Sequence, residues 1–104
     1  MDITFKEAAS LYKKNPERAR LIDVREVDEY QEGHLPKADL CPLSQLVSLT
    51  AQGAFKDQDL LLLYCRSGAR SGRACEFLRK KGFKEVYNCG GVLDYQGEFG
   101  PLEK

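Results

Sequence analysis

The segment from Leu60 to Tyr64 constrains the fold more than any other part of the chain, because it is apolar or aromatic at every position. A strand that alternates apolar and polar side chains can leave one face in water, whereas a strand without alternation must be covered on both faces. Leu60–Tyr64 therefore predicts the central strand of a parallel sheet that lies between two layers of helices.

The rest of the chain alternates between helical and extended patterns. Thr4-Phe5-Lys6-Glu7 has the form of a capping box, which predicts a helix that continues to Lys14 and ends at Asn15-Pro16. Further strands are expected at 20–24, 38–41 and 85–88, and further helices at 27–32, 42–49, 68–81 and after the double glycine at 90–91. Such alternation with short connections is typical of an α/β domain with a mainly parallel sheet and helices on both faces.

Length and charge narrow the class of protein further. A chain of 104 residues without internal repeats or linkers is expected to form a single domain over residues 1–104. The net charge of +0 gives no general attraction to nucleic acid or to an anionic membrane, so neither is expected as a partner. No apolar run approaches the roughly 18 residues of a membrane span, and no signal peptide is visible, so a cytoplasmic location is expected.

The loop that follows the central strand carries the chemistry. Cys65 comes directly after Tyr64, and Arg66 and Arg70 lie in the glycine- and serine-rich run that leads into the next helix. In open parallel sheets, ligands bind beyond the carboxyl ends of the strands. Gly68 lets the backbone approach a bound group, while the helix start offers free N–H groups and the positive end of its dipole. The loop therefore predicts a nucleophilic thiolate in a small anion-binding cradle.

Two reactions suit an anion cradle around a thiolate. In sulfur transfer, the cysteine carries a second sulfur atom as a persulfide anion, which the N–H groups can hold. In phosphoryl transfer, cysteine phosphatases use a Cys-x5-Arg loop, usually with histidine before the cysteine. Here four residues separate Cys65 from Arg70, and Tyr64 precedes the cysteine, so the shorter loop favours a single sulfur atom over a phosphate. A protease-type Cys–His pair is disfavoured because the only histidine, His34, follows Gly33 in a separate turn.

The other cysteines predict neither a metal site nor a disulfide framework. Cys41, Cys65, Cys75 and Cys89 form no C-x-x-C pair, and a single histidine is a poor complement for zinc. Disulfides suit small secreted chains without a core, whereas this chain is 42% hydrophobic, so free thiols are expected. Cys75 is expected in the core, and Cys89, beside the double glycine, is a candidate resolving thiol for Cys65.

Four motifs in order resemble the single-domain rhodanese family of sulfurtransferases. The segment 21–26 (LIDVRE) looks like the family's "IDVRE" strand end, and 29–30 with 33–38 (EY and GHLPKA) looks like its "E-[YF]…GHIPGA" segment. The segment 65–70 (CRSGAR) is similar to the six-residue active-site loop of the family, and Gly90-Gly91 to the "GG" before its last helix. The resemblance spans nearly the whole chain.

The resemblance implies a rhodanese-like fold with a parallel sheet of about five strands, and a thiosulfate sulfurtransferase that needs no cofactor and no metal. Cys65 would take the outer sulfur of a small anionic donor such as thiosulfate, keep it as a persulfide and pass it to cyanide or a thiol. By the same resemblance, the loop residues that bind the persulfide are Arg66, Ser67, Gly68, Ala69, Arg70 and Ser71. A sulfur-relay protein is a further expected partner.

Several alternatives remain beside this interpretation. Asp23 and Arg25 either contact the site from the neighbouring strand end or brace the loops around it. His34 is expected to stabilise its turn rather than to act in catalysis. Where many relatives have tryptophan after the double glycine, this chain offers Leu93 and Tyr95. A sulfur-carrier or sulfide-binding module loaded by a protein partner, or a phosphatase or arsenate reductase of related fold, are the alternative functions.

Overall fold

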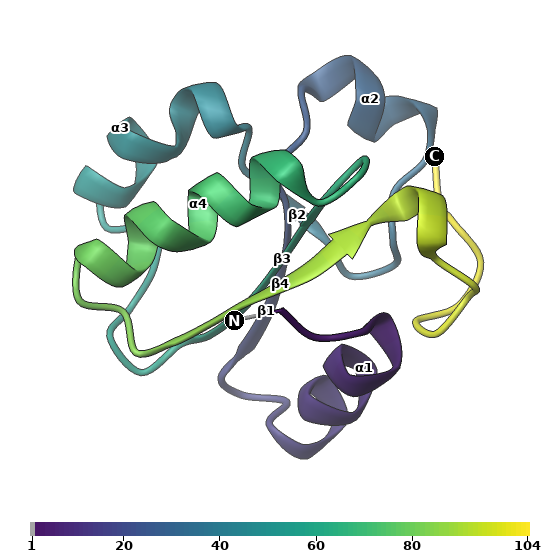
Figure 1. Ribbon diagram of the computed structural model, residues 1–104, viewed down its shortest axis with the longest axis horizontal. Helices are drawn as coiled ribbons and strands as arrows, with labels where there is room; N and C mark the ends of the chain where they lie inside the picture. The colour runs from purple at the N-terminus through teal and green to yellow at the C-terminus, as the bar shows by residue number, and fades with distance from the viewer. Residues whose placement is uncertain (1) are drawn as a thin grey trace.

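The computed structural model describes residues 2–104, which form a parallel sheet with helices on both faces (Figure 1). The sheet has the strand order β2-β1-β3-β4. The strands are β1 (Ala19–Asp23), β2 (Asp39–Leu40), β3 (Leu60–Cys65) and β4 (Glu85–Gly91). β3 pairs with β1 on one side and with β4 on the other, both in parallel register, so the predicted central strand is confirmed.

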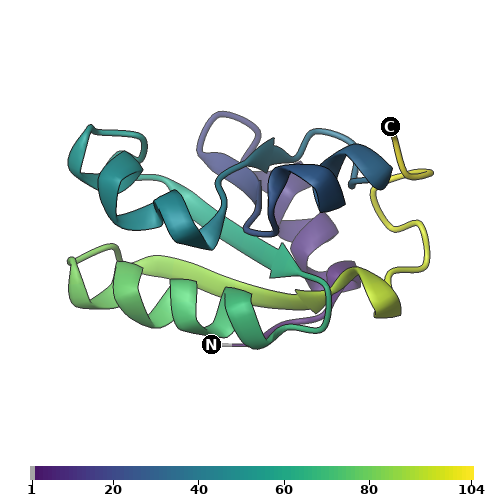
Figure 2. The same cartoon turned by 90° about the horizontal axis from the view of Figure 1, so that it is seen from above.

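Among residues 2–104, four α-helices and two short 3₁₀ helices precede, connect and follow the strands. They are α1 (Phe5–Lys14), α2 (Val27–Glu32), η1 (Leu43–Gln45), α3 (Leu46–Ala51), α4 (Ala69–Lys80) and η2 (Val92–Asp94). Figures 1 and 2 show α3 and α4 on one side of the sheet and α1 on the other. No helix among residues 2–104 is long and apolar enough to cross a bilayer.

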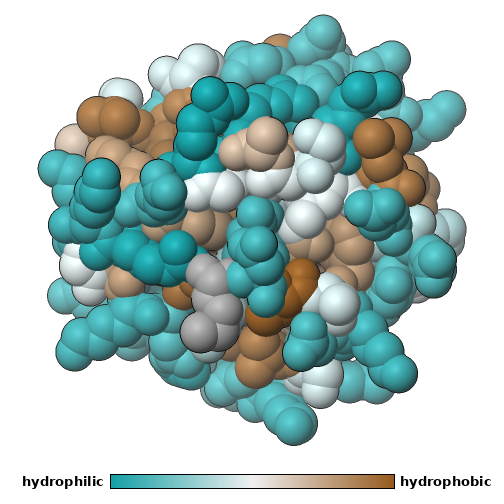
Figure 3. Space-filling view, in the orientation of Figure 1, coloured by the Kyte–Doolittle hydropathy of each residue, from teal (hydrophilic) through white to brown (hydrophobic). Residues whose placement is uncertain are grey.

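β3 divides its side chains between the two layers, and every residue of this strand is buried. Leu61, Leu63 and Cys65 belong to the core cluster beneath α3 and α4. The alternate residues, Leu60, Leu62 and Tyr64, belong to a second cluster that also contains Phe5 and Ala8 of α1. The face of the molecule seen in Figure 3 is mostly hydrophilic, with its apolar residues in small separate groups. The unbroken apolar run therefore serves two cores at once, as the lack of alternation predicts.

The first helix begins and ends where its sequence signals place it. The Glu7 backbone N–H donates to Thr4 Oγ1 at 3.0 Å, and the Thr4 N–H donates to Glu7 Oε1 at 2.9 Å, which completes the predicted capping box. The helix ends at Lys14, with Asn15 as its C-cap. The two hydrogen bonds satisfy backbone donors that a helix start otherwise leaves free.

The structure differs from the sequence-based expectation at two strands and one helix. The sheet has four strands rather than about five, because residues 2–3 pair with β4 only through the Asp2–Asn88 bridge before Thr4 caps α1. β4 runs to Gly91, three residues beyond the predicted end. The helix expected at 42–49 is instead a 3₁₀ turn followed by α3, which lasts to Ala51.

Candidate active site

Cys65 lies at the carboxyl end of the central strand, where β3 turns into α4. The loop between them is short, because Gly68 already serves as the N-cap of α4 with a left-handed φ of 104°. Glycine adopts this backbone conformation without the steric penalty that a Cβ atom brings. The thiol is 1% exposed, so it lies at the base of the loop rather than at its tip.

Hydrogen-bond donors converge on the sulfur of Cys65. The Gly68 backbone N–H donates to Cys65 Sγ at 3.0 Å, and the Ser71 hydroxyl lies 3.4 Å from the same atom. Burial by itself raises the pKa of the Cys65 thiol. The Ser71 hydroxyl and the backbone N–H groups of Ser71, Gly68 and Ser67 outweigh burial, so that the pKa lies below its usual value. The arrangement favours the thiolate, which is the nucleophilic form of cysteine.

Asn88 of β4 stabilises the Cys65 loop through hydrogen bonds to Ser71, Gly68 and Gly90. Its Oδ1 atom lies 2.7 Å from the Ser71 hydroxyl and accepts from the Gly90 N–H at 3.0 Å, while its Nδ2 donates to the Gly68 carbonyl at 3.1 Å. Asn88 is 8% exposed, so its amide is a buried polar group with partners for both of its ends. One side chain thus ties the loop, the first turn of α4 and the end of β4 together.

The double glycine after Asn88 supports the loop directly. Between β3 and β4 the pairing shifts from Leu63–Asn88 to Cys65–Gly91, which leaves one extra residue on β4. Gly90 accommodates this bulge with a φ of 93°. A Cβ atom on Gly91 would lie closer than 3.0 Å to the backbone of Arg66 and Ser67. The loop can therefore rest on the strand end only where the strand has no side chain.

Arg70 forms a two-point ion pair with Glu29 of α2. Its Nη1 and Nη2 atoms donate to Glu29 Oε1 and Oε2 at 2.7 and 2.8 Å. The hydrogen bonds from Arg70 lower the pKa of Glu29 to about 2, against the desolvation that opposes them, so the carboxyl stays ionised near neutral pH. The positive charge expected of Arg70 at the loop is thus balanced by a carboxylate, which the loop sequence alone does not indicate.

The remaining loop side chains point to solvent. Arg66, Ser67 and Ala69 are exposed, and the Arg66 guanidinium has no hydrogen bond or ion pair with any of residues 2–104. The Arg66 carbonyl accepts from the Leu93 N–H at 3.2 Å, which ties the loop to η2. Arg66 is therefore the loop arginine that is available to a ligand.

Asp23 and Arg25 brace the loops around the site. The Asp23 carboxylate is fully buried and accepts from the Arg25 backbone N–H at 2.9 Å and from its Nη2 at 2.7 Å. Arg25 Nη2 also donates to the Gly33 carbonyl at 2.7 Å. Of the two alternatives left open by the sequence, these contacts favour the bracing role, since Asp23 holds the Arg25 side chain and Arg25 joins the end of β1 to the loop that follows α2.

His34 takes part in its own turn. Its ring stacks on Tyr30 at a centroid distance of 3.8 Å, and its Nδ1 lies 3.1 Å from the Tyr30 carbonyl. Its backbone exchanges two hydrogen bonds of 2.8 Å with Glu103. None of these contacts involves Cys65, in agreement with a role in stabilising the turn.

The other three cysteines are free and buried. Burial raises the pKa of Cys41, raises that of Cys75 to about 12, and raises that of Cys89 as well. Cys75 lies in the core beneath α4, as its position on the helix predicts. Only Cys65 combines a pKa below the usual range with hydrogen-bond donors aimed at its sulfur. The raised pKa of Cys89 argues against its acting as a resolving thiol.

Leu93 and Tyr95, which follow the double glycine where many relatives have tryptophan, occupy different surroundings. Leu93 is 63% exposed next to Arg66, whereas Tyr95 packs edge-on against Phe5 at 5.2 Å and accepts from the Phe99 N–H at 2.8 Å. Leu93 is therefore the apolar side chain at the rim of the loop, and Tyr95 belongs to the core around α1.

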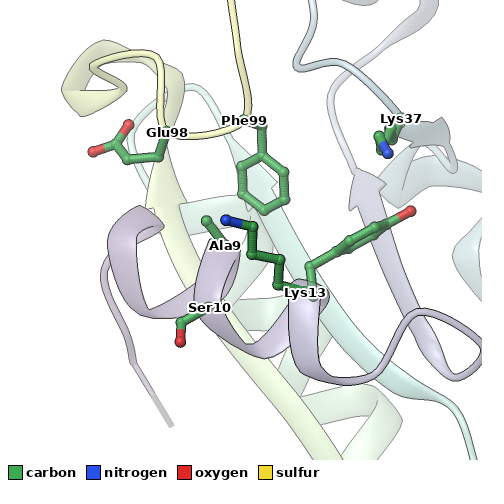
Figure 4. Close-up of a pocket in the computed structure, with 7 residues that line it drawn as sticks. Ala9, Ser10, Lys13, Lys37, Glu98 and Phe99 are labelled. Atoms are coloured by element: carbon green, nitrogen blue, oxygen red, sulfur yellow. The ribbon is translucent and has the colours of Figure 1, made fainter.

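A cavity of about 360 Å³ lies apart from the loop (Figure 4). Its lining comes from α1, the Lys37 turn and the segment near the carboxyl end: Ala9, Ser10, Tyr12, Lys13, Lys37, Glu98 and Phe99. It contains no cysteine, and none of the loop residues reaches it. Within residues 2–104, no group of three His, Cys, Asp or Glu side chains is placed to hold a metal ion.

Comparison with known proteins decides the family. A sequence model described as the rhodanese-like domain matches residues 4–98. The chain belongs to the rhodanese-like domain family. Over 73 residues it is 36% identical to a thiosulfate sulfurtransferase of Escherichia coli, PspE, covering 70% of each chain. It is 32% identical over 83 residues to a putative sulfur carrier protein of Bacillus subtilis, YrkF, of which it covers 44%.

Solved structures agree with this assignment. An E. coli structure described as rhodanese with anions superposes on the domain with a TM-score of 0.72 at 32% sequence identity, covering 83% of this chain and 98% of that one. The α/β architecture of this rhodanese-like domain is thus the architecture of its family, and known sulfurtransferases are among its relatives.

Two residues of the site were not identified from the sequence. The sequence marks Glu29 only as part of a motif, because its pairing with Arg70 is a contact between positions 41 apart. For Asn88 the sequence predicts a place in a strand and no role in the site. The signal that could have identified Asn88 is its amide side chain near the end of a buried strand, with one residue between it and the double glycine. A buried amide at such a position needs hydrogen-bond partners.

Proposed function

We propose that this rhodanese-like domain is a sulfurtransferase that carries a sulfane sulfur as a persulfide on Cys65. The observation that carries the proposal is the convergence of the Gly68 N–H and the Ser71 hydroxyl on the buried Cys65 sulfur. Donors arranged around one sulfur atom stabilise a thiolate, and the loop's N–H groups suit a terminal persulfide sulfur as well. Arg66 to Ser71 are accordingly proposed as the persulfide-binding loop, with Asp23 and Arg25 as its braces.

The reaction proceeds in two displacements. In the first, the Cys65 thiolate attacks the outer sulfur of thiosulfate. The Cys65 S–S bond forms, the S–S bond of the donor breaks with its electron pair, and sulfite leaves. In the second, cyanide or a thiolate attacks the outer persulfide sulfur, and thiocyanate or a new persulfide leaves while the Cys65 thiolate returns. Each step conserves charge and requires no metal, cofactor or outside oxidant.

Release of thiocyanate from thiosulfate and cyanide tests the proposal. The expected result is turnover that Cys65→Ala abolishes and Cys41→Ala retains, because Cys41 is equally buried but has a raised pKa and no donors aimed at its sulfur. Turnover that survives Cys65→Ala would contradict it. Hydrolysis of an aryl phosphate that depends on both Cys65 and Arg70 would favour the phosphatase alternative instead.

A sulfur-carrier module loaded by a partner protein is the second candidate. It is favoured by the relationship to the putative sulfur carrier protein YrkF and by the 1% exposure of Cys65, which restricts the approach of a donor. For a carrier, Cys65 would gain one sulfur atom from a persulfide donor but turn over thiosulfate poorly. Two measurements separate the candidates: the mass added to Cys65 by a persulfide donor, and the turnover number for thiosulfate.

A further inference from the structure

The ion pair between Glu29 and Arg70 lies beside the Cys65 loop, at the start of α4, and the inference drawn from it rests on the proposed sulfur transfer. Both side chains are about one-quarter exposed, at 24% for Glu29 and 28% for Arg70, so the pair is at the rim rather than in the core. Arg70 belongs to the first turn of α4, directly beyond the cradle of Cys65. The charges of this pair therefore lie beside the loop that holds the sulfur.

The pair is a neutral unit under ordinary conditions. Hydrogen bonds from Glu29 raise the pKa of Arg70, opposed by desolvation, and the nearby Cys65 thiolate raises it further. Arg70 lies five positions after Cys65, in the first turn of the helix that follows the loop. Glu29 stays ionised as well, so the positive charge that Arg70 brings toward the sulfur is offset by a carboxylate on the same rim.

Glu29 is held in place by more than Arg70. Its Oε1 atom also accepts from the Glu26 N–H at 3.1 Å as part of the capping box at the start of α2. A donor anion that displaces Glu29 from Arg70 must therefore break the charge pair and loosen a helix cap together. Asp23 and Arg25 form a second balanced pair behind it, which leaves Arg66 as the unpaired arginine of the loop among residues 2–104.

We propose that Glu29 is a specificity-determining residue that disfavours doubly charged sulfur donors relative to singly charged ones. Its carboxylate reduces the attraction of the loop for any anion, and the reduction is twice as large for a dianion as for a monoanion at the same position. The preferred donors are then sulfane compounds with a single negative charge, such as thiosulfonates and persulfides, over the thiosulfate dianion.

Thiosulfate and methanethiosulfonate are a matched pair of donors for a test. The Cys65 thiolate attacks the outer sulfur of each and forms the same Cys65 persulfide. The leaving group is sulfite, with two negative charges, in the first case and methanesulfinate, with one, in the second. The two reactions differ chiefly in one unit of donor charge, so the ratio of their kcat/KM values reports how the site responds to charge.

The variant Glu29→Gln removes the charge and keeps a side chain of the same size, and Glu32→Gln is the control. Glu32 lies on the same helix, is exposed and forms no ion pair with the other described residues. Glu29→Gln is expected to raise kcat/KM for thiosulfate relative to methanethiosulfonate by roughly threefold to tenfold, mainly through KM. Glu32→Gln should leave the ratio within about twofold, and added salt should shrink the Glu29→Gln effect.

The outcomes separate this inference from the function on which it rests. If neither donor adds sulfur to Cys65 in the unaltered protein, the proposed function fails. If both donors load Cys65 but Glu29→Gln changes both rates by the same factor, the specificity role is overturned and the pair only positions the loop.

Discussion

Gly91 supports the backbone of Arg66 because it has no side chain. A Cβ atom at Gly91 would meet the Arg66 carbonyl group and the Ser67 Cα closer than atoms can approach, and both contacts are with backbone that cannot rotate away. The cradle around Cys65 thus depends on a residue from another strand, 25 positions after Arg66 in the chain. This dependence explains a double glycine at the end of β4 without reference to catalysis.

Gly91→Ala is accordingly expected to displace the loop. The change should lower the free energy of unfolding by about 2 kcal/mol or more, since overpacking against rigid backbone is costly, and should reduce sulfur loading of Cys65 at least tenfold. Gly72→Ala is the matched control, because its Cβ would make an ordinary 3.5 Å contact with Asn88 in the first turns of α4. It should retain loading and gain about 0.5 kcal/mol of stability. Chemical denaturation and intact mass give both readouts, and equal behaviour of the two variants would contradict the support role.

The hydroxyl of Ser71 is expected to govern the reactivity of Cys65 toward iodoacetamide. In the unaltered protein, the alkylation rate of Cys65 should stay high at pH values below about 8.5, the usual pKa of cysteine. The reason is that hydrogen bonds to its sulfur lower the pKa of Cys65. Ser71→Ala removes one of these donors, so the pKa of Cys65 should rise and the alkylation rate at pH 6 should fall about tenfold. Ser67→Ala keeps its backbone N–H and should change little. An unchanged pH profile in Ser71→Ala would contradict the assignment.

The Glu29–Arg70 pair should also appear in the pH dependence of stability. The pKa of Glu29 in the folded protein is about 2, below its usual 4.5, so its stabilisation is fully present above about pH 5 and is lost as the pH falls toward 2. At pH 7, Glu29→Gln should lower the free energy of unfolding by about 1 kcal/mol relative to Glu32→Gln, a modest value because the pair is partly exposed. In urea denaturation the difference should shrink below about pH 4 and vanish only below about pH 2. A difference that grows on acidification would contradict the ion pair.

Lys37 is expected to be replaceable by glycine with a gain in stability. It is the only non-glycine residue among residues 2–104 with a positive φ, at 71°, a conformation that costs roughly 1 kcal/mol or more for a residue with a Cβ atom. Its ammonium lies 5.6 Å from the Tyr12 ring and offsets part of that cost, by about 0.5 kcal/mol. Lys37→Gly should therefore raise the free energy of unfolding by roughly 0.5 kcal/mol, measured by thermal denaturation. Destabilisation would show that the lysine–tyrosine contact outweighs the backbone strain.

Local signals in the sequence predicted the elements that depend on neighbouring residues. The apolar run at Leu60–Tyr64 and the Thr4–Glu7 capping box both predict structure within one element, and both predictions are confirmed. The same holds for α4, whose predicted range of 68–81 brackets the observed Ala69–Lys80.

Long-range contacts account for what the sequence did not predict. The Glu29–Arg70 pair and the Asn88 amide each join segments that only the folded sheet brings together. The extension of β4 to Gly91 depends on a bulge, which pattern alone does not reveal because the extra residue disturbs the period of two. The fold was thus predictable from local patterns, whereas the charge balance around Cys65 required the structure.

Intact mass after incubation with thiosulfate tests the central claim most directly. The account predicts that the protein gains about 32 Da, one sulfur atom, that the added mass maps to Cys65, and that cyanide removes it. Cys65→Ala should gain nothing, while Cys41→Ala should behave as the unaltered protein does. The absence of any added sulfur from thiosulfate, methanethiosulfonate or a persulfide donor would contradict the claim that Cys65 carries sulfur.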